Sequence, residues 1–264
     1  MCSTINTETH LIRMEKDTYI FVLSGLDPSG KAGFVRDIAT VTAIGGYAGG
    51  AVTALTIQDF AHTYGFVPVD PQTLSRQVEA VWEQKIPDAV KIGMVPNLQV
   101  AETISEILKK FRRRKNFFVV WDPVLASSDS FPLTEEDQIG QIFSALSPEI
   151  DILTPNLPEF RRLFGIAPEE KNIVAALEKF HIRGLILKGG HSNGDVATDI
   201  LVFGGKTAKF SRPKLKNSPR GTGCTFSSAL ATFYAIHRDI IKAFLETEKF
   251  MDQFLRNFCG GNLS

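Results

Sequence analysis

The sequence has few cysteines and no apolar run long enough to cross a membrane. Its three cysteines, Cys2, Cys224 and Cys259, form no CxxC pair, which argues against a disulfide framework and a structural zinc site. The first 16 residues are polar and carry no apolar core of a secretory signal. We therefore expect a protein of the cytoplasm with no membrane partner.

An excess of positive charge is also missing. Lys and Arg together number 29, and so do Asp and Glu, so the formal net charge is zero. No global positive field is available to hold a polyanion, and we expect no nucleic-acid partner. The basic run at 109–115 follows an apolar-periodic segment, and cations favour helix C-termini, so this run predicts a solvated helix end.

Two nucleotide-binding fingerprints are absent as well. The glycine-rich stretch at 24–33 lacks the spacing GxxxxGK[ST], because Lys31 is followed by Ala32, and it does not match GxGxxG. It is therefore neither a P-loop nor a dinucleotide-binding turn. We expect this loop to bring backbone close to a small ligand. Asp37, one turn inside the next helix, either faces the same crevice or lies on the solvated face of that helix.

Short apolar runs alternate with segments of helical period along most of the chain. This alternation predicts a three-layer α/β/α fold with a central, mostly parallel sheet. A hairpin is expected near the end, with strands at 199–203 and 207–210 around Gly204 and Gly205. Residues 1–17 are predicted to be a polar tail, and 18–264 a single domain. The expected strands are 19–23, 51–55, 88–92, 117–121, 150–153 and 184–187, and the expected helices are 34–44, 74–82, 98–111, 135–146, 157–164 and 173–180.

Polar and glycine-rich segments follow the predicted strands. In open α/β sheets the ligand lies at the carboxyl ends of the strands, so these segments can meet in one crevice. The segments are 24–27, 58–59, 93–94, 122–123, 154–156 and 188–191.

The run Gly221-Thr222-Gly223-Cys224-Thr225 precedes a small-residue, apolar stretch. Glycines allow backbone N–H groups to face a ligand, and a following helix adds the positive end of its dipole, which predicts an anion site. A thiol there has its thiolate favoured, so Cys224 could accept a proton or attack an electrophile. An ordinary helix start with a buried cysteine is the equally supported alternative.

Seven motifs occur in an order that is more specific than any one of them. Together they resemble the hydroxymethylpyrimidine and phosphomethylpyrimidine kinases of thiamine biosynthesis, which belong to the ribokinase superfamily, and the resemblance spans about residues 19–234. It implies a ribokinase-like domain with a small lid or none. The motifs are LDPSGKAG from Leu26, TALTIQ from Thr53, DAVKIGM from Asp88, DPV from Asp122, TPNLPE from Thr154, KGGH from Lys188 and GTGCT from Gly221.

The resemblance also implies roles for individual residues in a kinase that uses ATP and Mg²⁺. Gln58 would hydrogen-bond the aminopyrimidine edge, since an amide supplies both a donor and an acceptor. The remaining pyrimidine pocket would consist of Gly25, Asp37, Met94 and Val124. ATP would contact Asn156, Lys188 and Thr222, metal would be organised by Asp122 and Glu159, and catalysis would involve Gly221, Gly223, Lys188 and Cys224.

Several of these residues have plain structural alternatives. Met94 and Val124 could simply belong to the core. Asn156 could be a helix N-cap with Glu159 answering the helix dipole. Mg²⁺ prefers hard oxygen ligands and keeps several waters, which suits carboxylates such as Asp122 and Glu159.

The chain departs from the family pattern at Lys31, at Ser218-Pro219-Arg220 and at 126–130, where an expected glycine is missing. Lys31 and Arg220 are expected to add positive charge near the phosphates. A pyridoxal or pyridoxine kinase on the same fold is the alternative function. A non-catalytic pyrimidine-binding protein ranks below it, because Gln58, Asp37, Cys224 and Lys188 are all retained. The resemblance also raises the possibility of a homodimer.

Overall fold

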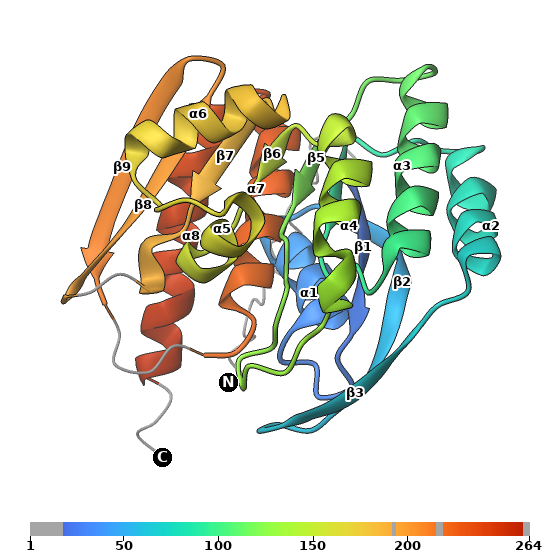
Figure 1. The fold of residues 1–264 in the computed structure, drawn as a ribbon, viewed down its shortest axis with the longest axis horizontal. Helices are drawn as coiled ribbons and strands as arrows, with labels where there is room; N and C mark the ends of the chain where they lie inside the picture. The colour runs from blue at the N-terminus through green and yellow to red at the C-terminus, as the bar shows by residue number, and fades with distance from the viewer. Residues whose placement is uncertain (1–17, 192–193, 215–218, 261–264) are drawn as a thin grey trace, which may run out of the picture.

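A computed structural model describes residues 18–191, 194–214 and 219–260. Within them, nine strands form one sheet in the order β3-β2-β1-β4-β5-β6-β7-β8-β9, with helices on both faces (Figure 1). This confirms the predicted three-layer architecture. The predicted tail at 1–17 and Ser218 lie outside the described residues. No helix in the described part of the chain is both long and apolar enough to span a bilayer.

The sheet is parallel through its centre and antiparallel at both edges. β2, β1, β4, β5, β6 and β7 pair in parallel, whereas β3 is antiparallel to β2, and β8 is antiparallel to both β7 and β9. The strands are β1 (Tyr19–Leu26), β2 (Tyr47–Gln58), β3 (Thr63–Pro68), β4 (Ala89–Ile92), β5 (Phe118–Trp121), β6 (Ile152–Leu153), β7 (Gly184–Leu187), β8 (Val196–Phe203) and β9 (Lys206–Pro213).

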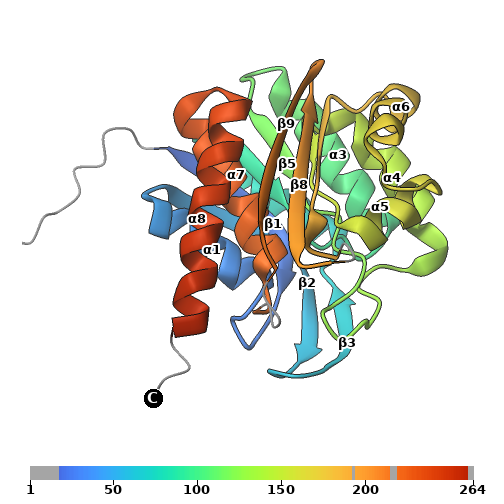
Figure 2. The same cartoon turned by 90° about the vertical axis from the view of Figure 1, so that its left-hand side faces the viewer.

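Two groups of helices enclose the sheet, as the views in Figures 1 and 2 agree. One face carries α2 (Pro71–Trp82), α3 (Leu98–Arg112), α4 (Ile139–Leu146), α5 (Leu157–Phe164) and α6 (Glu170–Phe180). The other carries α1 (Gly33–Ile44), α7 (Thr222–His237) and α8 (Ile240–Gly260). Three short 3₁₀ turns complete the described elements: η1 (Glu136–Gln138), η2 (Ser147–Glu149) and η3 (Gly189–His191).

Each face of the sheet has its own apolar core. On the α2 side, the Trp82 ring makes edge contacts with three phenylalanines at centroid distances of 5.2 to 5.3 Å. On the α7 side, Phe118 stacks on Tyr234 at 3.6 Å. Strands buried on both faces explain the continuous apolar runs that the sequence shows, which is typical of parallel sheets.

The basic run at 109–115 closes α3, as predicted. Asn97 caps the start of this helix, and Lys109, Lys110 and Arg112 occupy its last turn, where cations favour the helix dipole. Arg112 is more than a solvated end, because its Nη2 lies 2.6 Å from Oδ2 of Asp151. This ion pair fastens α3 to the start of β6.

The order of the strands places the ligand crevice. β1 lies between β2 and β4, so successive connections leave it in opposite directions, and such a reversal opens a crevice at the carboxyl ends of the strands. β3 was not predicted from the sequence, and it pairs with the end of β2 to form an antiparallel ribbon (Figure 1). This ribbon is the small lid of the fold.

The ribbon has two unlike faces because side chains alternate along a strand. Thr56 and Gln58 line the crevice, whereas Leu55, Ile57 and Val67 are about half exposed on the other face, at 48%, 57% and 55%. An exposed apolar face of this kind is a feature of association surfaces. The homodimer suggested by the family resemblance stays a prediction.

Candidate active site

Two cavities lie at the carboxyl ends of the strands. The larger has a volume of about 630 Å³ and the smaller about 160 Å³. The two cavities are adjacent, because five residues line both of them. The shared residues are Asn156, Lys188, Gly190, Thr222 and Gly223.

The larger cavity gathers every predicted site residue except Asp37. These residues come from six different strand ends and from the start of α7, which confirms that the polar segments meet in one crevice. The predicted residues that line it are Gly25, Gln58, Met94, Asp122, Val124, Asn156, Glu159, Lys188, Gly221, Thr222, Gly223 and Cys224.

Helix α7 begins at the junction of the two cavities. Gly221 is its N-cap with φ of 81°, and a Cβ there would lie 2.2 Å from the main-chain oxygen of Lys31, so only glycine fits. No side chain caps this helix. The N–H groups of its first turn have no partner within the helix, and together with the helix dipole they favour negative charge at this point.

The ion pair of Lys188 and Asp122 lies directly beside this helix start. Lys188 Nζ is 2.7 Å from Asp122 Oδ1, and both side chains are largely buried. Burial lowers the pKa of Lys188, but the attraction of Asp122 and Glu159 outweighs it and holds that pKa above its usual value. Lys188 is therefore a permanent positive charge at the shared wall.

Cys224 differs from its prediction. The side chain lies in the first turn of α7 and lines the larger cavity, yet the residue is only 8% exposed. Burial raises the pKa of the Cys224 thiol to about 12, although the charge of Lys91 opposes this. The expectation that the helix N-terminus favours the thiolate is wrong, because desolvation outweighs the dipole. Cys224 is a protonated thiol at neutral pH.

Asn156 and Glu159 form a capping box at the start of α5. The Asn156 side chain accepts from the main-chain N–H of Glu159 at 2.9 Å, and Glu159 Oε2 accepts from that of Asn156 at 2.8 Å. Burial raises the pKa of Glu159 to about 7. The structural alternative for these two residues is thus confirmed, although both also line the larger cavity. Among the described residues, no three Asp, Glu, His or Cys side chains cluster closely enough to enclose a metal.

Asp37 lies beneath the cavity and not in its wall. It is fully buried, its Oδ2 is 2.7 Å from Lys91 Nζ, and its Oδ1 accepts from Ser228 Oγ at 2.9 Å. Both alternatives of the sequence analysis, a crevice-facing and a solvated Asp37, are therefore wrong. The ion pair that Lys91 makes was not predicted either, because a lysine in an apolar strand gives no sign of its partner.

Gln58, at the end of β2, lies in contact with Arg220. Arg220 Nη2 donates to Gln58 Oε1 at 3.1 Å. The expectation of positive charge near the phosphates is corrected for Lys31, whereas for Arg220, which lines the larger cavity next to Gly221, it stays a prediction. Arg220 turns to Gln58, and the Lys31 ammonium lies 5.9 Å from the centre of the Phe60 ring. Lys31 does not line the larger cavity.

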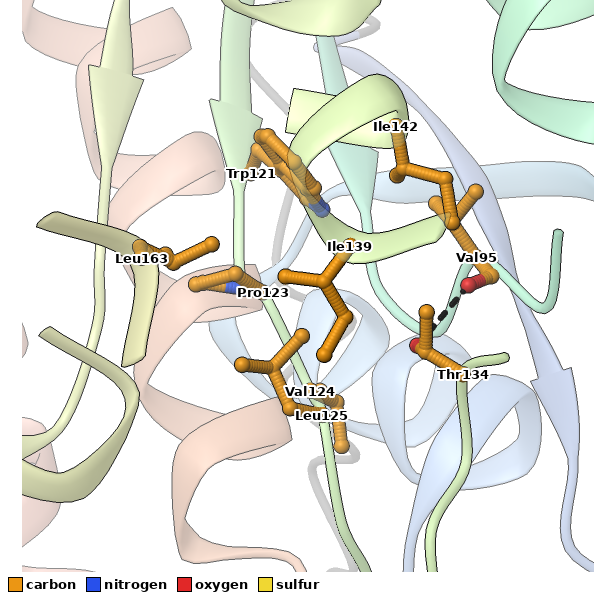
Figure 3. Close-up of a pocket in the computed structure, with 9 residues that line it drawn as sticks. All are labelled: Val95, Trp121, Pro123, Val124, Leu125, Thr134, Ile139, Ile142 and Leu163. Carbon is orange, nitrogen blue, oxygen red and sulfur yellow. Dashed lines mark hydrogen bonds between the residues drawn. The ribbon is translucent and has the colours of Figure 1, made fainter. Parts of the chain in front are cut away.

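The wall that carries Val124 is supported by apolar packing (Figure 3). A void of only about 10 Å³ remains among these side chains, and the Thr134 hydroxyl donates to the main-chain oxygen of Val95 at 3.0 Å across it. Val124 lines both this void and the larger cavity. One side of the Val124 side chain therefore packs against apolar neighbours, and the other faces the larger cavity. Val124 is both a core residue and a residue of the cavity wall.

The smaller cavity lies between β8, β9, α7 and α8 and was not predicted. Phe226, Met251 and Leu255 supply apolar walls, and Arg212 lies beside them. Arg212 is fixed by Asp199 at 2.7 Å and by Glu248. These residues are far apart in the sequence and share no motif, so no sequence signal could have grouped them.

This fold is that of the ribokinase-like kinases. A Bacillus subtilis pyridoxal kinase, solved as an ADP complex, has a TM-score of 0.77 and 24% identity over 89% of this chain and 90% of its own. The phosphomethylpyrimidine kinase of Clostridium difficile 630 has a TM-score of 0.75 and 29% identity, over 89% of this chain and 98% of its own.

Sequence comparisons identify the family within this class. The model of the phosphomethylpyrimidine kinase family matches residues 27–262. A hydroxymethylpyrimidine/phosphomethylpyrimidine kinase from Aquifex aeolicus is 34% identical over 240 residues, which cover 89% of this chain and 93% of that relative. The chain belongs to the phosphomethylpyrimidine kinase family.

The buried pair Lys91–Asp37 leads to a prediction about stability. Replacing Lys91 by Met strands a buried carboxylate, so the free energy of unfolding should fall by about 3 to 5 kcal/mol. The double variant Lys91→Met, Asp37→Leu should lose less than Lys91→Met alone, because neither charge is left behind. Urea titrations monitored by tryptophan fluorescence measure these differences.

Lys110→Met is the matched control for this experiment. Its partner is Glu79 at 3.0 Å, but the Lys110 side chain is 49% exposed, so the loss should stay below about 1 kcal/mol. If Lys91→Met has the same free energy of unfolding as Lys110→Met, the buried pair of Lys91 and Asp37 does not stabilise the fold.

Proposed function

We propose that this protein transfers phosphate from ATP to 4-amino-5-hydroxymethyl-2-methylpyrimidine and then to its monophosphate, two steps of thiamine biosynthesis. The observation that carries the proposal is the junction of the two cavities at the uncapped start of α7. A donor in one cavity and an acceptor in the other would meet at an anion site. Phosphoryl transfer needs this positioning and charge stabilisation more than covalent chemistry.

The larger cavity would hold the pyrimidine and the smaller one the adenine side of the nucleotide. Gln58 would read the ring by hydrogen bonds, while Met94 and Val124 supply apolar contact. In the smaller cavity, the apolar side chains of Phe226 and Met251 suit a flat base. Asn156 and Thr222 lie in the shared wall, where they would meet the phosphates.

Charge that develops on the transferred phosphoryl group would be stabilised by the first N–H groups of α7 and by Lys188. These donors are fixed before the reaction, so they need no reorganisation in the transition state. Lys188 remains protonated because its pKa is held above its usual value by Asp122 and Glu159. Gly221 and Gly223 allow the backbone to approach this point.

Asp122 and Glu159 would organise Mg²⁺ on the same side of the cavity. Both carboxylates line it, and one or two carboxylates together with phosphates are a usual set of partners for this ion. Burial raises the pKa of Glu159 to about 7, and a bound cation would stabilise the charged form of this carboxylate. Mg²⁺ would neutralise phosphate charge there.

The thiolate of Cys224, a small fraction of the side chain at neutral pH, would accept the proton of the substrate hydroxymethyl group in the first step and become the thiol. Its reduced form is needed for this role, which a reducing compartment such as the cytoplasm maintains. In the second step the acceptor is a phosphate oxygen that is already largely anionic at neutral pH. That step requires no base from the protein.

A pyridoxal kinase is the alternative, supported by the likeness of fold. A coupled assay for ADP with the pyrimidine, pyridoxal and pyridoxine as acceptors distinguishes the two functions. We expect ATP consumption to depend on the pyrimidine and to be weaker with either vitamin B6 compound. ADP formation that does not require the pyrimidine would refute the proposal, and a preference for pyridoxal would favour the alternative.

The raised pKa of Cys224 predicts an uncommon pH dependence. Since this pKa is about 12 owing to burial, the thiolate fraction grows as the pH rises above neutral. The kcat/KM of the first phosphorylation should therefore increase by about tenfold per pH unit. The second phosphorylation serves as the internal control and should stay nearly flat over the same range.

Replacing Cys224 by Ala should slow the first step and remove its pH dependence, while the second step is nearly unchanged. Separate steady-state assays with each acceptor measure this. If Cys224→Ala keeps the rate and the pH profile of the first step, Cys224 is not the base.

A further inference from the structure

Arg220 spans the gap between the start of α7 and the tip of the ribbon. Its Nη2 donates to Gln58 Oε1 and its Nη1 to the main-chain oxygen of Asp59, both at 3.1 Å. Asp129 Oδ1 lies 4.0 Å from Nη2, and the Arg220 side chain is only 17% exposed. Three partners therefore fix the guanidinium in the wall of the larger cavity.

This contact determines which way the Gln58 amide points. A guanidinium has five N–H donors and no acceptor, so only the amide oxygen, and not the nitrogen, can face Arg220. Thr63 Oγ1 lies 3.2 Å from the same oxygen and also 3.2 Å from Asp129 Oδ1. A hydroxyl has a single proton to donate, so Arg220 is the partner that turns the amide oxygen of Gln58 toward the protein.

The ribbon and the loop at 126–131 hold this arrangement in place. Asp129 accepts from the main-chain N–H of Thr63 at 2.8 Å and from the hydroxyl of Ser127. Hydrogen bonds from Ser127 and Thr63 lower the pKa of Asp129 to about 2, so it stays ionised beside Arg220. The amide nitrogen of Gln58 has no acceptor among the described residues, and Gln58 lines the cavity.

We propose that Arg220 is a positioning residue that makes Gln58 a donor-only reader of the substrate ring. The site then recognises a ring nitrogen, which accepts a hydrogen bond, and does not pair the exocyclic amine. This inference rests on the proposed function for the identity of the ring. It also revises the expectation that Gln58 offers both a donor and an acceptor to the aminopyrimidine edge.

A purely structural role for Arg220 has a different signature. If the guanidinium only fastened the ribbon to α7, its removal would weaken all ligands alike or lower stability. A positioning role instead changes the preference between two ligands that differ only in the exocyclic amine. It acts on KM and on dissociation constants more than on kcat.

The test compares 4-amino-5-hydroxymethyl-2-methylpyrimidine with 5-hydroxymethyl-2-methylpyrimidine, which lacks the amine. Calorimetry gives the dissociation constants, and steady-state assays give KM and kcat for each compound. The unmodified protein should bind the two compounds within about tenfold of each other, because the amide oxygen faces Arg220 and the amide nitrogen faces the ring. Arg220→Met frees that oxygen and should raise the preference for the amine by about tenfold.

Two further substitutions at cationic residues serve as comparisons. Arg220→Lys keeps a donor for the amide oxygen and should retain the original preference. Arg162→Met removes another cation of the same cavity, whose partner is Glu136 at 2.9 Å, and should leave the preference unchanged.

Gln58→Glu provides a second line of evidence if Arg220→Met does not fold. The carboxylate keeps its partner Arg220 but cannot donate, so both compounds should lose affinity by a similar factor. A loss confined to the compound with the amine would overturn the inference.

The outcomes separate this inference from the proposed function. A preference of about a hundredfold or more for the amine in the unmodified protein would overturn the donor-only role while the kinase proposal stands. Similar binding of both compounds without phosphorylation of either would refute the kinase proposal and support the donor-only role. Failure to bind either compound would refute both.

Discussion

The close approach of the α7 N-terminus to the Lys188–Asp122 ion pair is the constraint on which the site depends. A Cβ on Gly223 would lie 3.2 Å from Asp122 Oδ2 and 3.3 Å from Lys188 Nζ, so a side chain would press on both charged groups. With glycine there, backbone N–H groups, a cation and a carboxylate converge on one point. That point is also where the two cavities meet, and it makes transfer between them possible.

Burial explains the unusual protonation states around this junction. Below the cavity floor, the fully buried side chains of Asp37 and Lys91 neutralise each other. Above them, Cys224 and Glu159 have raised pKa values because desolvation outweighs the nearby positive charges. The sheet thus supplies a buried, nearly neutral floor, and Lys188 provides the positive charge at the junction.

The extent to which the sequence predicts this structure depends on how local each signal is. Strand and helix periods, the glycines of α7 and the strand-end motifs are local. They led to the correct layers, and every predicted site residue except Asp37 lies in the wall of the larger cavity. Asp37 and Cys224 were misread because their surroundings come from distant segments. β3 was missed since its exposed apolar side chains do not resemble a buried strand. The contact of Arg220 with Gln58 joins residues 162 positions apart, and no spacing rule reaches that far.

Substitution of Gly223 by Ala tests the central claim most directly. Alanine suits a helix, so the fold should persist, but its Cβ should displace the Lys188–Asp122 pair by a few tenths of an ångström. The measurement is kcat for the first phosphorylation, together with dissociation constants for ATP and the pyrimidine. We predict that kcat falls by about tenfold or more while both dissociation constants change by less than about threefold. An unchanged kcat would contradict the assignment of this junction as the point of phosphoryl transfer.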